Sequence, residues 1–140
     1  MRLALLAVIM LSQAAMAETT VAIDAERAAA NYRLNCQGCH LADGSGLPGV
    51  VPPMQGLIGN FLTVPGGRDF LVQVPGSANS PLSDADLAEL LNWILATMSD
   101  EQKPVDFEPY TEAEVQRTRR KVLVDVAKVR ETLINSRPER

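Results

Sequence analysis

Cysteine, histidine and aromatic residues are scarce in this chain of 140 residues. The two cysteines exclude a mini-protein held together by several disulfides. The apolar run Leu3–Leu11 is too short for the roughly 20 residues that cross a membrane, and no other run approaches that length. No segment alternates apolar and polar residues as a half-buried strand does. We therefore expect a small all-α protein, and neither an integral membrane protein nor a multidomain enzyme.

The first seventeen residues have the pattern of a secretory signal peptide. Arg2 precedes the unbroken apolar run Leu3–Leu11, and Ala15–Ala17 has the small-x-small form of a cleavage site. We predict cleavage before Glu18, which places the mature protein in the periplasm without an integral membrane segment. An uncleaved signal anchor is the alternative, but an apolar run of this length is too short to cross a bilayer.

Charge is divided unequally along the expected mature chain. Residues 18–109 hold four basic and twelve acidic side chains, whereas residues 110–140 hold eight basic and five acidic ones. The acidic part argues against binding to nucleic acid, which requires clustered positive charge. The two charged regions are either solvated surfaces or, for the acidic part, a means of steering toward a basic partner.

Both cysteines and the histidine lie together in Cys36-Gln37-Gly38-Cys39-His40, the signature of covalent haem attachment. Each thiol can form a thioether to a porphyrin vinyl group, and the adjacent His40 supplies an axial nitrogen to the iron. We predict one covalently bound haem c. No histidine then remains to act as a base in a Cys–His or Ser–His–Asp arrangement, so we predict no catalytic residues.

Three other uses of the Cys36/Cys39 pair are possible in principle. A zinc site needs further Cys or His ligands that the chain lacks. A thioredoxin-type redox pair requires a βαβ setting, of which the sequence shows no sign. A structural disulfide stays open in an exported protein.

Helical patterns flank a long segment rich in glycine and proline. The first predicted helix follows Asp24, a good N-cap, and leads into the haem signature. Leu41–Leu82 then holds eight of the nine glycines and six of the nine prolines, which predicts loops with short helices near Gln55–Leu62 and Arg68–Val74. Such a segment is expected to wrap a large rigid ligand. A second clear helix, capped by Ser83, carries apolar residues at helical spacing as far as Met98.

With these features, Asp24–Met98 resembles a class I c-type cytochrome. Ala28 and Tyr32 stand eight and four positions before the first cysteine, where the family has a small residue, usually Gly, and an aromatic one. Leu90 and Trp93 match the leucine and aromatic residue of the family's C-terminal helix. The resemblance implies a haem domain whose N- and C-terminal helices cross beside the haem, with Tyr32 and Trp93 packed within that domain.

The resemblance also implies the surroundings of the iron. The family has a proline about a dozen residues after the axial histidine, and its carbonyl accepts the ring N–H; Pro52 fits that place and would orient His40. The family's sixth ligand is a methionine in the loop before the C-terminal helix, where Val74 stands here.

The sixth ligand therefore has no obvious source. Only Met54 and Met98 remain after signal cleavage. Met54 is the weak candidate for the ligand, although packing against the porphyrin is the alternative. Met98 ends an apolar helical stripe and is expected in the core. Asn79 in the loop and an open iron site are the other possibilities.

The C-terminal part forms a separate feature. Residues 99–110 are predicted to be a linker, and residues 111–140 a helical tail that begins with the capping box of Thr111 and Glu114. Its apolar seam is interrupted by Arg119 and consists of Val115, Val122, Val126, Val129 and Leu133. The tail either folds back on the haem domain or docks a partner or a second copy.

The expected organisation is a signal peptide over residues 1–17, a monohaem domain over 18–98, a linker over 99–110 and a helical tail over 111–140. The favoured function is periplasmic carriage of single electrons, with a dehydrogenase or a terminal reductase as the kind of partner that the resemblance implies. The alternatives are a haem protein whose open distal site binds a small ligand, and a haem subunit of a larger oxidoreductase complex.

Overall fold

The computed structural model describes residues 22–137; the predicted signal peptide, Met1–Ala17, lies outside the described residues. Within this range the regular structure is entirely helical, which confirms the all-α class. The elements are α1 (Ala25–Asn35), α2 (Gln37–His40), η1 (Ile58–Thr63), α3 (Gly67–Gln73), α4 (Pro75–Ala78), α5 (Asp84–Met98), η2 (Asp100–Gln102), α6 (Glu112–Thr118) and α7 (Val126–Asn135). No described helix has the length and apolar character needed to cross a membrane.

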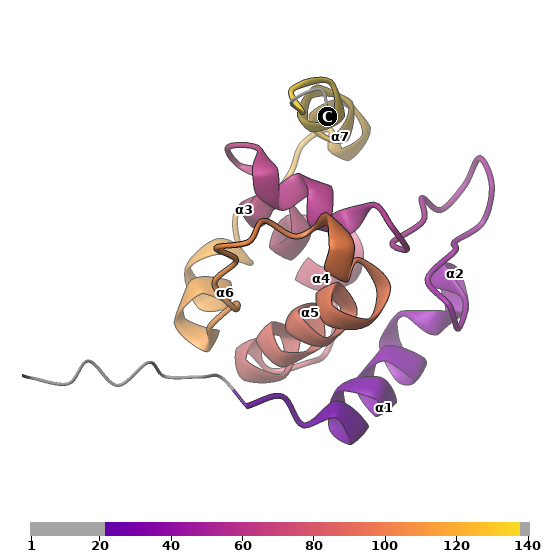
Figure 1. The fold of residues 1–140 in the computed structure, drawn as a ribbon, viewed down its shortest axis with the longest axis vertical. Coiled ribbons are helices and arrows are strands. Elements are labelled where there is room, and N and C mark those ends of the chain that lie inside the picture. The colour runs from indigo at the N-terminus through magenta and orange to yellow at the C-terminus, as the bar shows by residue number, and fades with distance from the viewer. Residues whose placement is uncertain (1–21, 138–140) are drawn as a thin grey trace, which may run out of the picture.

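Helices α1 and α5 pack against each other and form one side of the molecule (Figure 1). Ala28 and Tyr32 on α1 are fully buried. The Tyr32 ring lies against that of Trp93 on α5, with 5.6 Å between the ring centroids. The small and aromatic positions recognised in the sequence therefore form the helix contact.

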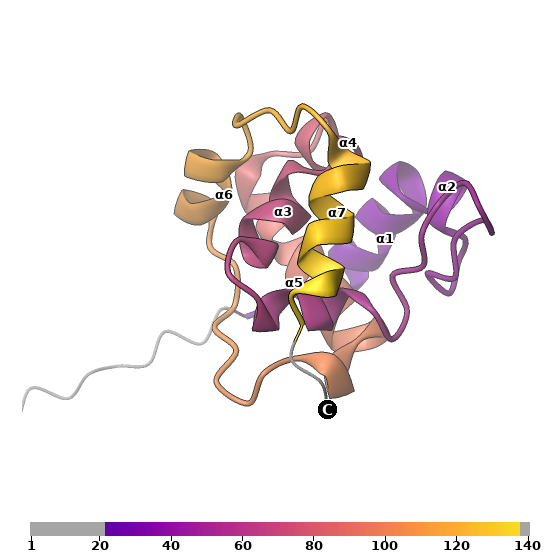
Figure 2. The same cartoon turned by 90° about the horizontal axis from the view of Figure 1, so that it is seen from above.

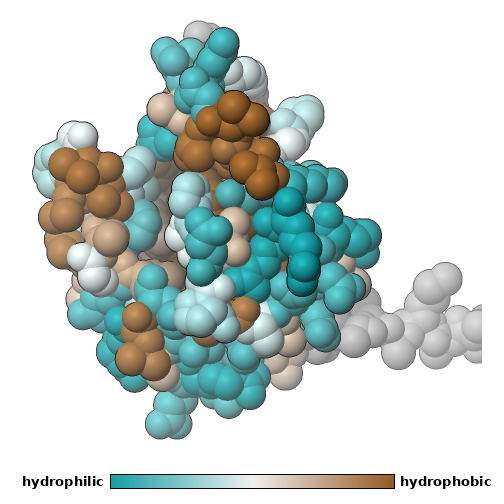
Figure 3. Space-filling view, turned by 180° about the vertical axis from the view of Figure 1, so that it is seen from behind, coloured by the Kyte–Doolittle hydropathy of each residue, from teal (hydrophilic) through white to brown (hydrophobic). Residues whose placement is uncertain are grey.

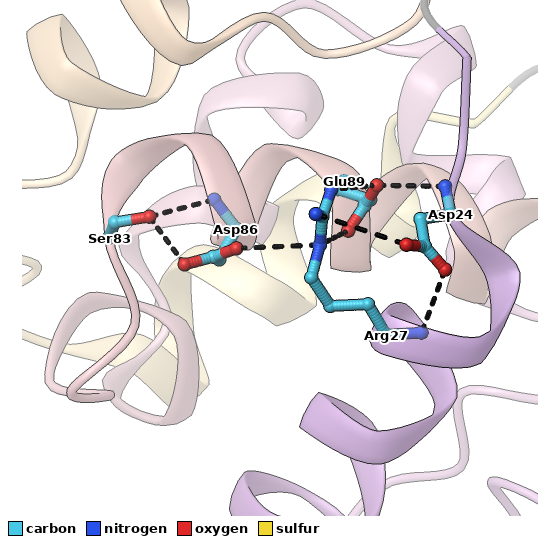
Figure 4. A network of polar contacts seen from close by, with 5 residues as sticks. All are labelled: Asp24, Arg27, Ser83, Asp86 and Glu89. Atoms are coloured by element: carbon cyan, nitrogen blue, oxygen red, sulfur yellow. Dashed lines mark hydrogen bonds and ion pairs between the residues drawn. The ribbon is translucent and has the colours of Figure 1, made fainter.

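A buried carboxylate locks the start of α1 onto α5 (Figure 4). Glu89 is 6% exposed. Its two carboxylate oxygens accept hydrogen bonds of 2.8 Å from Nε and Nη2 of Arg27. The oxygen bonded to Nη2 also accepts the backbone N–H of Asp24 at 2.8 Å. The carboxylate is thus paired and hydrogen-bonded, as a buried charge must be.

Glycines allow the segment after α2 to fold closely upon itself. Gly44 has a φ of +76°, and a Cβ there would lie 2.6 Å from Sδ of Met98. A Cβ on Gly67 would lie 1.9 Å from the carbonyl oxygen of Phe61, so only glycine allows α3 to pack this tightly on η1. The two short helices predicted in this segment are present as η1 and α3.

The residues after α5 are packed against the rest of the chain. Tyr110 is fully buried. Asn92 on α5 accepts the Tyr110 backbone N–H at 2.7 Å and donates to its carbonyl at 3.0 Å. On α6, Val115 is fully buried, and the Glu114 carboxylate accepts a hydrogen bond of 2.8 Å from Nη2 of Arg68. The tail is therefore folded back, the first of the two interpretations of its seam.

The tail contains two separate helices. Helix α6 ends at Thr118, and α7 begins only at Val126, where Asp125 accepts the Lys128 backbone N–H as its N-cap. Arg119 turns its guanidinium away from the tail toward the carbonyl oxygens of residues 78, 80 and 82. Val122 is 87% exposed in the connecting loop and takes no part in a seam.

Helix α7 lies across the outside of α3 (Figure 2). Its Leu133 belongs to the main core, and Val126, Val129 and Ile134 pack against that core. The C-terminal helix therefore covers one face of the loop-rich half of the molecule.

Candidate cofactor site

A cavity of about 450 Å³ lies between α2 and the loop-rich half of the molecule. Its volume is within the range typical of sites that bury a small molecule or cofactor. Most of its wall is apolar and is supplied by Ile58, Phe61, Phe70, Leu71, Leu87, Leu90, Leu91 and Ile94, together with shorter segments of the loops. The glycine- and proline-rich segment thus surrounds much of the cavity.

The haem-attachment signature forms part of this wall. Cys36, Cys39 and His40 all line the cavity, and both thiols are free. The backbone N–H groups of Cys39 and His40 both donate to the Cys36 carbonyl, at 3.1 and 2.9 Å, so a single helical turn brings the three side chains to one place. Burial, with a smaller contribution from Cys39, raises the pKa of the Cys36 thiol to about 11. The protonated thiol is a poor ligand for a metal ion.

The ring of His40 is prepared to act as a neutral ligand. Its Nδ1 is buried and makes no hydrogen bond within residues 22–137. Burial lowers the pKa of His40, and the Pro52 carbonyl nearby partly opposes that effect. The neutral imidazole is the form that binds metals. An unpartnered buried nitrogen is costly, and it fits a site completed by another group.

These residues fit a haem better than they fit an isolated metal ion. Among the described residues no group of three or more His, Cys, Asp or Glu side chains could hold a metal. A large apolar cavity with two free thiols and one imidazole on its wall matches a planar apolar group attached by thioethers.

Tyr32 and Trp93 support the site without lining the cavity. Tyr32 donates its hydroxyl to the Leu41 carbonyl at 2.7 Å, which fixes the chain directly after His40. Burial raises the pKa of Tyr32, so the hydroxyl keeps the proton that it donates. Tyr32 therefore contributes to the site by holding the attachment motif in position.

Met54 and Met98 differ in their position relative to the cavity. Met54 is half-buried and lines the cavity, and its backbone N–H donates to the Gly44 carbonyl at 2.7 Å. Met98 does not line the cavity, because its Sδ lies against Gly44. Asn79 lines a neighbouring cavity instead. Met54 consequently stays the one methionine among the described lining residues, and its ligation of iron stays a prediction.

Sequence reasoning missed the part that the C-terminal helix plays here. Val126 and Arg130 of α7 line the cavity together with the attachment motif. The apolar spacing identified Val126, Val129 and Leu133 as one face of a helix, and Arg130 lies on that same face. A charged residue within an apolar stripe was the available signal.

Comparisons with known proteins agree with this site. No family model matches the chain. It is 33% identical over 106 residues to cytochrome c-552 of Thermus thermophilus, covering 63% of this chain and 81% of that protein. A second cytochrome c-552 from the same species gives the same identity with 72% of its length covered.

Proposed function

The chain belongs to the class I c-type cytochromes, and from this membership we propose that it carries single electrons between redox partners in the periplasm. It contains one covalent haem c and is an electron-transfer protein, not an enzyme. The observation that supports the proposal most strongly is the cavity wall on which two free thiols and the unpartnered histidine lie together.

The attachment motif has a separate task for each side chain. Cys36 and Cys39 form the thioethers that prevent loss of the cofactor outside the cell. His40 would hold the iron through a ring nitrogen, and the Pro52 carbonyl, which lies near the imidazole, would help to orient the ring. Bound haem supplies an iron that takes up and releases one electron. The apolar walls exclude water from the cavity.

The surface suits a transient encounter with a positively charged partner. Cys39 is exposed, so the cofactor edge that it holds is near the surface, where an electron can enter. The face seen in Figure 3 is mostly hydrophilic, with apolar groups in separate patches. The acidic residues of the haem domain steer it toward a basic patch. A dehydrogenase or a terminal reductase is the kind of partner that we propose.

The periplasmic location rests on the sequence of the first seventeen residues. Thioether attachment suits that location, since a covalently held cofactor is not lost by dissociation. Mass spectrometry of the exported protein tests the cleavage before Glu18. An N-terminus that still contains the apolar run Leu3–Leu11 would contradict it.

A second candidate function is binding of a small ligand at an open face of the iron. Apart from Met54 and the attachment motif, the described lining residues offer neither sulfur nor imidazole. Val74 also occupies the position where the family resemblance places a methionine. These observations favour a weakly ligated or open site.

Absorption spectra distinguish the two candidates. A low-spin ferric spectrum with a far-red sulfur-to-iron band, unchanged when carbon monoxide is added to the reduced protein, supports Met54 ligation. Loss of that band in Met54→Ala, with Met98→Ala as the matched control, assigns the ligand. A high-spin spectrum that shifts with carbon monoxide instead supports the open site.

A further inference from the structure

The inner face of α7 contains one charged residue. The residues of this helix that are not exposed recur at intervals of three and four, and they are Val126, Val129, Arg130, Leu133 and Ile134. All of them except Arg130 are apolar and pack against the core. Lys128 and Glu131, the neighbouring charged residues, are exposed. Arg130 is therefore directed inward with the apolar stripe.

Arg130 has no partner for its charge. It makes no hydrogen bond and no ion pair among residues 22–137. It lines the cavity, and it is the one Arg, Lys, Asp or Glu side chain among the described residues that do so. Arginines on buried faces are normally paired, because an unpaired charge loses hydration without compensation.

We propose that Arg130 pairs with a carboxylate of the haem and that α7 is thereby part of the cofactor site. The inference rests on the proposed function, because haem provides the anionic group: its two propionates are the carboxylates of the cofactor. The planar guanidinium donates to a carboxylate through two parallel N–H groups. A free anion such as phosphate shares this chemistry and is the competing source.

The pairing has an electrostatic consequence for electron transfer. Ferric haem carries one more positive charge than ferrous haem. A guanidinium that neutralises a propionate therefore favours the ferrous state, and its removal leaves an additional negative charge that favours the ferric state. The midpoint potential should fall when the charge of Arg130 is removed.

The test uses the exported holoprotein and begins with its haem content. Arg130→Met keeps an unbranched apolar stem on the inner face, so that α7 still packs. We expect its equilibrium constant for reduction to fall about three- to tenfold, tenfold being 59 mV for one electron. Lys128→Met removes a charge of the same sign from the exposed face of the same helix and should change the constant less than twofold. Arg130→Lys retains the charge and should recover at least half of the lost potential.

Distinct results overturn the inference and the proposed function. Equal shifts in Arg130→Met and Lys128→Met show only a long-range charge effect and reject the pairing. The midpoint potential of the wild-type protein could instead change with phosphate concentration at constant ionic strength, and this change could be lost in Arg130→Met. That result would show that Arg130 binds a free anion, and it would also reject the pairing with a propionate. Absence of covalent haem from the wild-type protein rejects the proposed function itself.

Discussion

Replacing Asn92 by alanine should weaken the attachment of the C-terminal segment to α5. Asn92 is 2% exposed, and its amide satisfies both backbone groups of Tyr110, with the N–H bonded at 2.7 Å and the carbonyl at 3.0 Å. In Asn92→Ala both groups lose their partners at a site where Asn92 and Tyr110 are both buried.

The expected loss follows from those two groups. An unsatisfied buried donor or acceptor costs about 1–3 kcal/mol, so the pair should lower the free energy of unfolding by about 2–6 kcal/mol. The carboxamide volume removed adds to this cost, since a residual cavity loses packing contacts. The loss is a large fraction of the stability of a domain of this size.

Denaturant unfolding of the holoprotein, followed by circular dichroism, measures this loss. Asn31→Ala is the matched control, because Asn31 is also on a helix and its side chain makes no hydrogen bond among the described residues. It should lower the free energy of unfolding by less than about 0.5 kcal/mol. A loss below about 1 kcal/mol in Asn92→Ala, or one equal to that of the control, would refute the reasoning.

Three other changes test further parts of the structure. Arg119→Ala removes the bonds to the carbonyls of residues 78, 80 and 82 and should lower the free energy of unfolding by about 2–3 kcal/mol; unchanged urea unfolding would contradict this. Burial raises the pKa of Tyr110 above its ordinary value of 10.0, so above that pH the unfolded chain releases this proton first and stability falls as pH rises. Tyr110→Phe should flatten that fall by about 1.4 kcal/mol per pH unit, and an unaltered alkaline slope in thermal melts would argue against the assignment. Gly44→Ala places an alanine at a φ of +76° with its Cβ 2.6 Å from Sδ of Met98, so it should lower the melting temperature. Gly49→Ala has open space at its Cβ and should lower the melting temperature less. Equal melting temperatures of the two variants would show that the contact with Met98 does not destabilise the protein.

The local signals in the sequence predicted much of the architecture. Asp24, Ser83 and Thr111 each cap the helix that the pattern assigned to them, because a side-chain oxygen at an N-cap acts within a single turn. The contact of Tyr32 with Trp93 also followed, since the family resemblance provided a pairing that spacing alone does not contain.

The tail shows where local signals were insufficient. The apolar spacing from Val115 to Leu133 is compatible with one helix, and nothing in it reveals that the Arg119 guanidinium bonds to loop carbonyls about 40 positions earlier. The position of Arg130 at the cavity likewise depends on the break between α6 and α7. Contacts between distant segments decided both features, and such contacts leave no periodic trace.

A redox titration of the exported protein tests the central claim most directly, after acid–acetone extraction of a parallel sample has removed any haem that is not covalently bound. The account predicts that the haem stays with the protein through Cys36 and Cys39, and that its absorption follows a single reversible one-electron curve. A protein that yields its haem to the extraction, or that shows no reversible one-electron curve, would contradict the account.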